Sequence, residues 1–218
     1  NTAFAEENSQ EAIASYFFDE VVVTATRTPV NEFKVNANIN VITSEDIAKN
    51  HYTDLSEALR SIPGVTIANY SLAGYDNSNG LKINGADEIV VLIDGVKMNA
   101  AGNKFSATMF KNLDNVERIE VLKGSASTLY GSDAKGGVIN IITKKINHNQ
   151  SKIKITGGSY ATENYLFSTE GRDEDWSWRI SRQKDLLGDF KDGRGVTTPA
   201  HLNGDTTSIK ITKEIGEK

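Results

Sequence analysis

Two hydrophobic patterns divide the chain near residue 148. Before that point, apolar residues form short clusters separated by Gly, Asn and Ser, a pattern that predicts short strands and helices around one core. After it, apolar and polar residues alternate over long stretches, as in β-strands whose two faces meet different surroundings. The sequence therefore predicts an α+β domain, built as a small mixed sheet with short helices, followed by antiparallel β-strands.

The first part carries signals for two short helices and several strands. Thr43 is placed to cap a helix that ends near Asn50. Thr53 is expected to cap a second helix, over residues 54–61, which Pro63-Gly64 ends. Strands are predicted at residues 38–42, 65–67, 81–83, 89–93, 116–122 and 138–143. The segment 89–93 is apolar at every position, so we expect it to be the central, covered strand.

In the second part, each predicted strand has one apolar and one polar face. The apolar faces carry Ile153, Ile155, Tyr165, Phe167, Trp176, Trp178, Ile180, Ile209 and Ile211. A short turn is expected at residues 172–175 and a long loop at about 186–205. Transmembrane hairpins with a wet lumen show this alternation, and so do soluble sheets with one solvated face. On its own, the alternation favours the soluble sheet.

Composition narrows the classes of function. The 218-residue chain has no Cys, which excludes a disulfide scaffold, a Cys-ligated zinc site and a thiol nucleophile. Its longest aliphatic run, residues 89–93, is far shorter than the about 20 apolar residues of a membrane-spanning helix. The net charge of −5 argues against a nucleic-acid partner, which would call for a basic surface.

The beginning of the chain has features of an exported protein. Ala3-Phe4-Ala5 has the small-x-small form of a signal-peptidase site, so we interpret residues 1–5 as a signal-peptide remnant. The polar residues that follow, to about residue 18, show no periodicity and are expected to be flexible.

Several short motifs suggest chemistry that the rest of the chain does not support. Ser132 and Lys135 have the spacing of a serine-acylase motif, but its companion motifs are missing. No cofactor is required by any motif. The long loop is a candidate for structural calcium, because carboxylates are the ligands that this cation prefers. Its candidate ligands are Asp185, Asp189, Asp192 and Asp205.

Five motifs, in this order, resemble the plug domain of TonB-dependent outer-membrane transporters. They are Glu-Val-Val-Val-Thr-Ala at 20–25, Ile-Pro-Gly-Val at 62–65, Val-Leu-Ile-Asp-Gly-Val at 91–96, Val-Glu-Arg-Ile-Glu-Val-Leu-Lys-Gly at 116–124, and residues 129–143. Residues 151–218 look like the first four strands of the family's barrel. One departure is Asn84, where the family usually has Arg, and it puts in doubt the usual ionic contact between plug and barrel at that turn.

The resemblance implies a transporter, not an enzyme, in the outer membrane of a diderm bacterium. Residues 6–30 would be a flexible N-terminus with a TonB box, residues 31–147 the plug domain, and residues 148–218 the first four strands of an incomplete β-barrel. The carboxy-terminal domain of TonB would pair, as an added strand, with the box. The matching residues are Glu20, Val21, Val22, Val23, Thr24 and Ala25.

Ligands in this family meet outward-facing plug loops. The matching loops here hold Tyr70, Tyr75, Asn77, Asn79, Asn99 and Asn103. They contain no His for haem, and Lys104 is their one cation, whereas a tri-anionic catecholate siderophore would call for several. Residues 84–99 also look closer to the family's cobalamin importers. The sequence thus places cobalamin or a related corrinoid slightly ahead of an iron-siderophore or haem.

Two alternatives remain open. Four strands leave two open edges, which are not tolerated against lipid, so a second polypeptide or a missing C-terminal region is expected to complete the family's barrel of about 22 strands. The main rival is a soluble periplasmic or secreted binding protein derived from a detached plug. The outward-facing aromatic residues, among them Trp176 and Trp178, favour contact with outer-membrane lipid instead.

Overall fold

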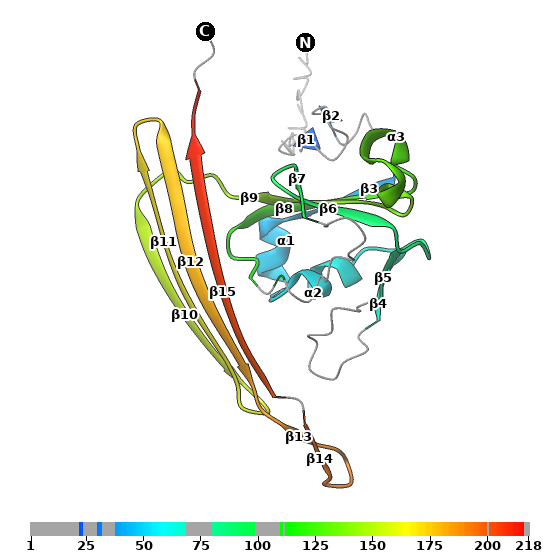
Figure 1. Ribbon diagram of the computed structural model, residues 1–218, viewed down its shortest axis with the longest axis vertical. Coiled ribbons are helices and arrows are strands. Elements are labelled where there is room, and N and C mark those ends of the chain that lie inside the picture. Colours follow the sequence, from blue (N-terminus) through cyan, green and yellow to red (C-terminus); the bar gives the residue numbers. More distant parts are fainter. Residues whose placement is uncertain are drawn as a thin grey trace, which may run out of the picture.

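The computed structural model describes residues 22–23, 30–31, 38–68, 80–98, 110, 112–199 and 201–215. Most of them form two parts: a first domain, up to about residue 147, and a long antiparallel sheet that curves alongside it (Figure 1). Within the described residues, no helix has both the length and the apolar character needed to cross a membrane.

A five-stranded sheet forms the centre of the first domain, in the order β3-β8-β9-β6-β7. Its strands are β3 (Asn38–Thr43), β6 (Ile89–Ile93), β7 (Val96–Lys97), β8 (Val116–Lys123) and β9 (Gly137–Thr143). β6 and β9 pair in parallel and the other neighbours antiparallel, so the sheet is mixed, as predicted. The first four residues of β6 are buried, which confirms it as a covered strand.

The first helix, α1 (Ser44–Lys49), begins as the sequence predicts. The Thr43 hydroxyl accepts a hydrogen bond from the Asp46 amide at 3.1 Å, and the Asp46 carboxylate accepts one from the Thr43 amide at 2.9 Å. This reciprocal cap satisfies amides that a helix start leaves unpaired. Because Thr43 also ends β3, the cap fixes the angle at which α1 leaves the sheet and turns Ile47 into the core.

The second helix, α2 (Leu55–Arg60), begins one residue later than predicted. Asp54, and not Thr53, is its N-cap, because the Asp54 carboxylate accepts the Glu57 amide at 2.9 Å. Thr53 instead donates its hydroxyl to the Glu57 carboxylate, also at 2.9 Å.

One face of the sheet packs on α1 and α2 and holds the main core of the domain (Figure 1). Its fully buried side chains include Leu55, Leu59, Val91, Ile119 and Ile139. The opposite face packs a smaller cluster beneath α3 (Ser127–Tyr130) and the 3-10 turn η3 (Ser132–Ala134). The hairpin of β4 (Val65–Ala68) and β5 (Gly80–Ile83) extends from the domain, and its neighbouring turn at Asn84-Gly85 has the positive φ values that such a turn requires.

The long sheet contains four strands in sequence order: β10 (Gln150–Gly158), β11 (Thr162–Asp173), β12 (Trp176–Leu187) and β15 (Leu202–Lys213). All pairings are antiparallel. Glu174 and Asp175 form the short turn between β11 and β12, whereas the connection from β12 to β15 contains a further small hairpin, β13 (Phe190–Lys191) with β14 (Thr197–Thr198). The predicted loop at 186–205 is therefore shorter than expected, because both long strands continue into it.

The two faces of the long sheet are inverted with respect to an ordinary soluble sheet. On the face turned away from the first domain, called the outer face, Ile153 is 73% exposed and Ile209 is 65% exposed. On the inner face, Glu170, Arg179 and Gln183 are buried. The exposed outer and buried inner positions alternate along β11 and β12, and the pairing register places the apolar residues of β10 and β15 on the same outer face. The fold class is confirmed: a small α+β domain followed by antiparallel strands of an incomplete barrel.

Candidate functional site

Most residues predicted to bind TonB or ligand lie outside the described residues. This applies to Glu20, Val21, Thr24, Ala25, Tyr70, Tyr75, Asn77, Asn79, Asn99 and Asn103. Within the predicted TonB box, Val22 and Val23 form β1, which pairs antiparallel with β2 (Val30–Asn31). The extended conformation expected for the box is thus present at these two residues. Their role stays a prediction.

The four Asp residues predicted as calcium ligands are all described, but the structure does not bring them together. Asp185 is buried on the inner face, where it accepts hydrogen bonds from Asn164 and Gln183. Asp205 pairs with Arg182 and Lys184, which alternate along β12 with Asp185 and so lie on the outer face. Two carboxylates on opposite faces of one sheet cannot share a cation.

The other two calcium candidates lie in the connection between β12 and β15. Asp189 is 3.7 Å from the imidazole of His201. Asp192 accepts hydrogen bonds from the backbone amides of Val196 and Arg194, and these bonds hold its pKa below the ordinary value. Across the described residues, no three His, Asp or Glu side chains gather in a way that could hold a metal ion.

The inner face of the long sheet instead touches the first domain through charged and polar side chains. One such contact, called the clamp, joins Asp94, Thr143 and Lys210. Asp94 lies in the turn between β6 and β7 with φ +49°, Thr143 ends β9, and Lys210 comes from β15. The Lys210 ammonium is 2.6 Å from the Asp94 carboxylate and 2.5 Å from the Thr143 hydroxyl. The carboxylate also accepts the Thr143 amide and hydroxyl, both at 2.8 Å.

The clamp keeps Asp94 ionised. Burial on its own would raise the pKa of Asp94, but the hydrogen bonds from Lys210 and Thr143 and the charge of Lys210 outweigh it, so the pKa lies below its ordinary value. The β6–β7 turn of the first domain is therefore tied by a charged contact to the fourth strand of the long sheet, 116 residues further along the chain.

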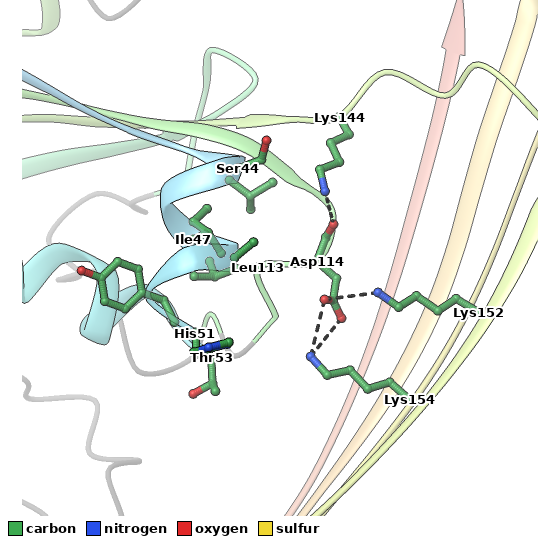
Figure 2. Close-up of a pocket in the computed structure, with 12 residues that line it drawn as sticks. Ser44, Ile47, His51, Thr53, Leu113, Asp114, Lys144, Lys152 and Lys154 are labelled. Atoms are coloured by element: carbon green, nitrogen blue, oxygen red, sulfur yellow. Dashed lines mark hydrogen bonds and ion pairs between the residues drawn. The ribbon is translucent and has the colours of Figure 1, made fainter.

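A second contact, called the lysine cluster, lies between α1 and β10. Figure 2 shows Lys152 and Lys154 extending from β10 toward Asp114, which belongs to the first domain. The Asp114 carboxylate is 3.2 Å from the ammonium of Lys152 and 3.3 Å from that of Lys154. Lys144, the residue after β9, donates a hydrogen bond from its ammonium to the backbone carbonyl of Asp114 at 3.0 Å. A pocket of about 380 Å³ lies beside these groups.

Farther along the inner face, polar side chains are buried against one another. Arg179 of β12 pairs with Glu170 of β11, and both side chains are less than a tenth exposed. Gln150 donates a hydrogen bond to the same carboxylate, and Arg179 reaches the backbone carbonyl of Lys144 at 3.4 Å. Burial of a charge is tolerated only when the charge is paired in this way. The inner face is therefore a connected polar surface and not a second apolar core.

None of these three contacts was predictable from the pattern of the sequence. Asp94 was recognised only as part of the motif at 91–96, and the lysines of β10 only as part of the polar face of a predicted strand. Alternation did indicate that Lys152, Lys154 and Lys210 would share the polar faces. It could not show which acidic residue each would meet, because the partners lie in a different domain. The Asn84 turn makes its contact within the first domain, where its amide donates to the Gly64 carbonyl at 2.8 Å.

Comparison with known proteins identifies the first domain. Residues 31–138 match the family model of the TonB-dependent receptor plug domain. The ferric enterobactin receptor of Pseudomonas aeruginosa, in a mutant form bound to enterobactin, is 30% identical with a TM-score of 0.52, and the match covers 70% of this chain and 25% of the receptor.

Two further solved structures show the same fold at lower identity. The ferripyoverdine receptor of the outer membrane of Pseudomonas aeruginosa is 21% identical with a TM-score of 0.63, covering 79% of this chain and 23% of the receptor. The ferric yersiniabactin uptake receptor of Yersinia pestis is 22% identical with a TM-score of 0.57, and the match covers 80% of this chain and 28% of the receptor. The chain thus spans about a quarter of the length of the structures that it matches.

Proposed function

Because residues 31–138 form a TonB-dependent receptor plug domain, we propose that this chain is the gating and energy-coupling part of a transporter that imports a metal chelate across the bacterial outer membrane. From here on, the first domain is called the plug domain. The family consists of receptors, so the role is transport and not catalysis. The long sheet supplies part of the wall that surrounds the plug domain.

One observation carries this proposal: the plug domain lies against the polar face of a sheet whose apolar face is exposed. Ile153, Phe167 and Ile211 are each at least 47% exposed on the outer face. A soluble protein would place such a face inward, whereas a membrane barrel turns it to lipid and encloses a wet lumen. The same observation argues against the rival of a soluble, detached plug.

The two ends of the long sheet agree with an outer-membrane orientation. The connection between β11 and β12 is a two-residue turn, whereas the β12–β15 connection contains the β13–β14 hairpin at the opposite end (Figure 1). Outer-membrane barrels have short periplasmic turns and longer extracellular loops. The β11–β12 turn is therefore assigned to the periplasmic side. The strands that close the barrel come from a missing C-terminal region or from a second polypeptide.

Energy coupling is assigned to residues 20–25, as an added strand on the carboxy-terminal domain of TonB. The extended Val22–Val23 segment supports this assignment, because strand addition relies on main-chain hydrogen bonds of an extended chain. The described residues do not include the outward plug loops predicted to bind ligand, so their role stays part of the proposal.

The ligand proposed here is an iron-siderophore, placed ahead of the corrinoid that the sequence favoured. The solved structures that support this choice include receptors for ferric enterobactin, ferripyoverdine and ferric yersiniabactin. The structure also weakens the earlier objection that the plug loops carry too few cations. Lys152 and Lys154 project from the long sheet toward the plug domain and share a single carboxylate, so the wall contributes positive charge to the lumen.

Calorimetric titration of the complete receptor with a ferric catecholate, cyanocobalamin and haemin tests the ligand class. Tight binding of the ferric catecholate with no binding of cyanocobalamin is expected. Tight binding of cyanocobalamin alone would make a corrinoid the favoured ligand instead. Uptake that continues unchanged in cells without TonB would contradict the proposed transport mechanism, whichever ligand binds.

A further inference from the structure

We propose that the lysine cluster is a binding site for the anionic oxygens of an iron chelate, inside the lumen between α1 and β10. This inference rests on the proposed function and names a second site, separate from the outward plug loops. The chelate would be of the kind whose peripheral oxygens are carboxylates or catecholates. Such a ligand would meet this site after it has passed the outer loops and before it leaves the lumen.

The charges of the cluster do not balance. Lys144, Lys152 and Lys154 place three ammonium groups around one carboxylate, that of Asp114. In the part of the chain that the structure describes, the ion pairs of Lys152 and Lys154 both go to this one group. Lys144 meets only a neutral carbonyl there. Three cations around one carboxylate leave a surplus of positive charge, which attracts an anion more strongly than a single lysine would.

The distances also leave room for a better acceptor. Asp114 lies 3.2 to 3.4 Å from the two ammonium groups of β10, which is longer than the about 2.7–2.9 Å of a strong charge-assisted hydrogen bond. Lys152 remains 52% exposed and Lys154 46% exposed, so each has unused donor capacity toward the lumen. An incoming oxyanion would therefore share these lysines with Asp114.

The rest of the pocket suits a ligand that is only partly polar. Besides the lysines, the pocket is lined by Ile47, Tyr52 and Leu113. Ile47 and Leu113 belong to the buried core, so the half-buried Tyr52 is the apolar side chain most open to a ligand there. Its volume of about 380 Å³ is near the lower end of the about 300–1,000 Å³ of small-molecule sites. One anionic arm of a chelate fits there, with its apolar part against the plug domain.

These 218 residues contain no Cys, so a label can be placed at this pocket. Thr53 lines the pocket and is exposed, so Thr53→Cys accepts a single fluorophore in a complete receptor whose remaining chain has had any Cys replaced by Ser. Quenching by bound iron then reports occupancy without any need for energised transport. The probes are a ferric tricatecholate, which carries a charge of −3, and a neutral ferric trihydroxamate.

Two variants separate a binding role from a structural one. Lys152→Gln with Lys154→Gln removes the cations, and we expect it to weaken quenching by the tricatecholate by about tenfold or more, which corresponds to the loss of a charge-assisted hydrogen bond. Asp114→Asn removes the competing carboxylate and should strengthen quenching. Both variants break the same contact between the plug domain and the sheet. If the lysine cluster had only a structural role, the affinity for the tricatecholate would therefore change in the same direction in both variants.

Lys184→Gln is the matched control, because Lys184 also pairs with a shared aspartate but lies on the outer face. It should leave tricatecholate quenching unchanged, and the neutral probe should respond weakly to every variant. Equal quenching by both probes, or parallel shifts in the lysine and Asp114 variants, would overturn the proposed site. Quenching of the expected pattern in a receptor that shows no uptake would leave the site standing and contradict the proposed function instead.

Discussion

The plug domain and the long sheet use their apolar residues in opposite ways. In the plug domain, Leu55, Leu59 and Ile119 are fully buried between helices and sheet. In the long sheet, Ile153 is 73% exposed and Ile211 66% exposed, while Glu170 and Arg179 are buried. The first part has its apolar core inside. The second is stable only when something apolar covers its outer face, which in the outer membrane is lipid.

This difference determines how the two parts can meet. An apolar contact between them would have made one permanent core, as in a single soluble domain. They meet instead through the clamp, the lysine cluster and the hydrogen bond that Arg179 donates to the Lys144 carbonyl. Contacts of this kind can be replaced by water or by a polar ligand at modest cost. A plug domain held by such contacts can stay closed and still be moved.

The largest expected effect is on the core of the plug domain. Leu55 is fully buried on α2, so Leu55→Ala should lower the free energy of local unfolding by about 2–5 kcal/mol through lost burial and a cavity. Hydrogen exchange of the α1 and α2 amides in the complete receptor measures it. Leu129→Ala on α3, where the side chain is 37% exposed, should cost clearly less. Equal losses would mean that the plug domain lacks the core described here.

A charge on the outer face tests the inverted sheet. Ile180 is 41% exposed on that face, and Ile180→Lys should destabilise the receptor in lipid by about 2–4 kcal/mol, because lipid solvates an ammonium poorly. Ser181→Lys points the same group into the lumen and should cost much less. Urea unfolding of the two variants in bilayers gives the comparison. A larger loss from Ser181→Lys would reverse the assignment of the faces.

The clamp should contribute less than either apolar surface. Its ion pair is about one-third exposed at both partners, so Lys210→Met is expected to lower the unfolding free energy by about 1 kcal/mol or less. A double-mutant cycle with Asp94→Asn isolates the pairwise term. Additive effects of the two substitutions would show that the contact does not couple the plug domain to the sheet.

The smallest expected effect is the response of the clamp to acid. Because the pKa of Asp94 is lower in the folded protein than its ordinary 3.8, its contribution is fully present above pH 3.8 and is lost as the pH falls through the lowered value. Spin labels on the plug domain and on β15 should report a constant distance from pH 7 to about pH 4 and loosening below it. In Asp94→Asn, this acid step should vanish.

How much of this follows from sequence differs between the two regions. Local signals predicted the Thr43 cap and the covered strand β6, and alternation predicted both faces of the long sheet. The cap of α2 was missed by one residue, because Thr53 and Asp54 are both good caps and only the fold decides between them. The contacts of Asp94 with Lys210 and of Asp114 with β10 were not predictable. The alternation of polar and apolar residues shows which face of a strand a residue occupies, but it does not show which residue of another domain that side chain will meet.

The central claim, that this plug domain is coupled to TonB by strand addition, is tested most directly at Val22. Val22→Pro removes the backbone N–H that strand pairing uses, whereas Val22→Ala keeps it. With both variants of the complete receptor at equal abundance in the outer membrane, ligand binding and uptake of labelled chelate are measured on the same cells. The account predicts that both variants bind ligand normally and that only Val22→Pro loses uptake. Equal uptake by the two variants would contradict it.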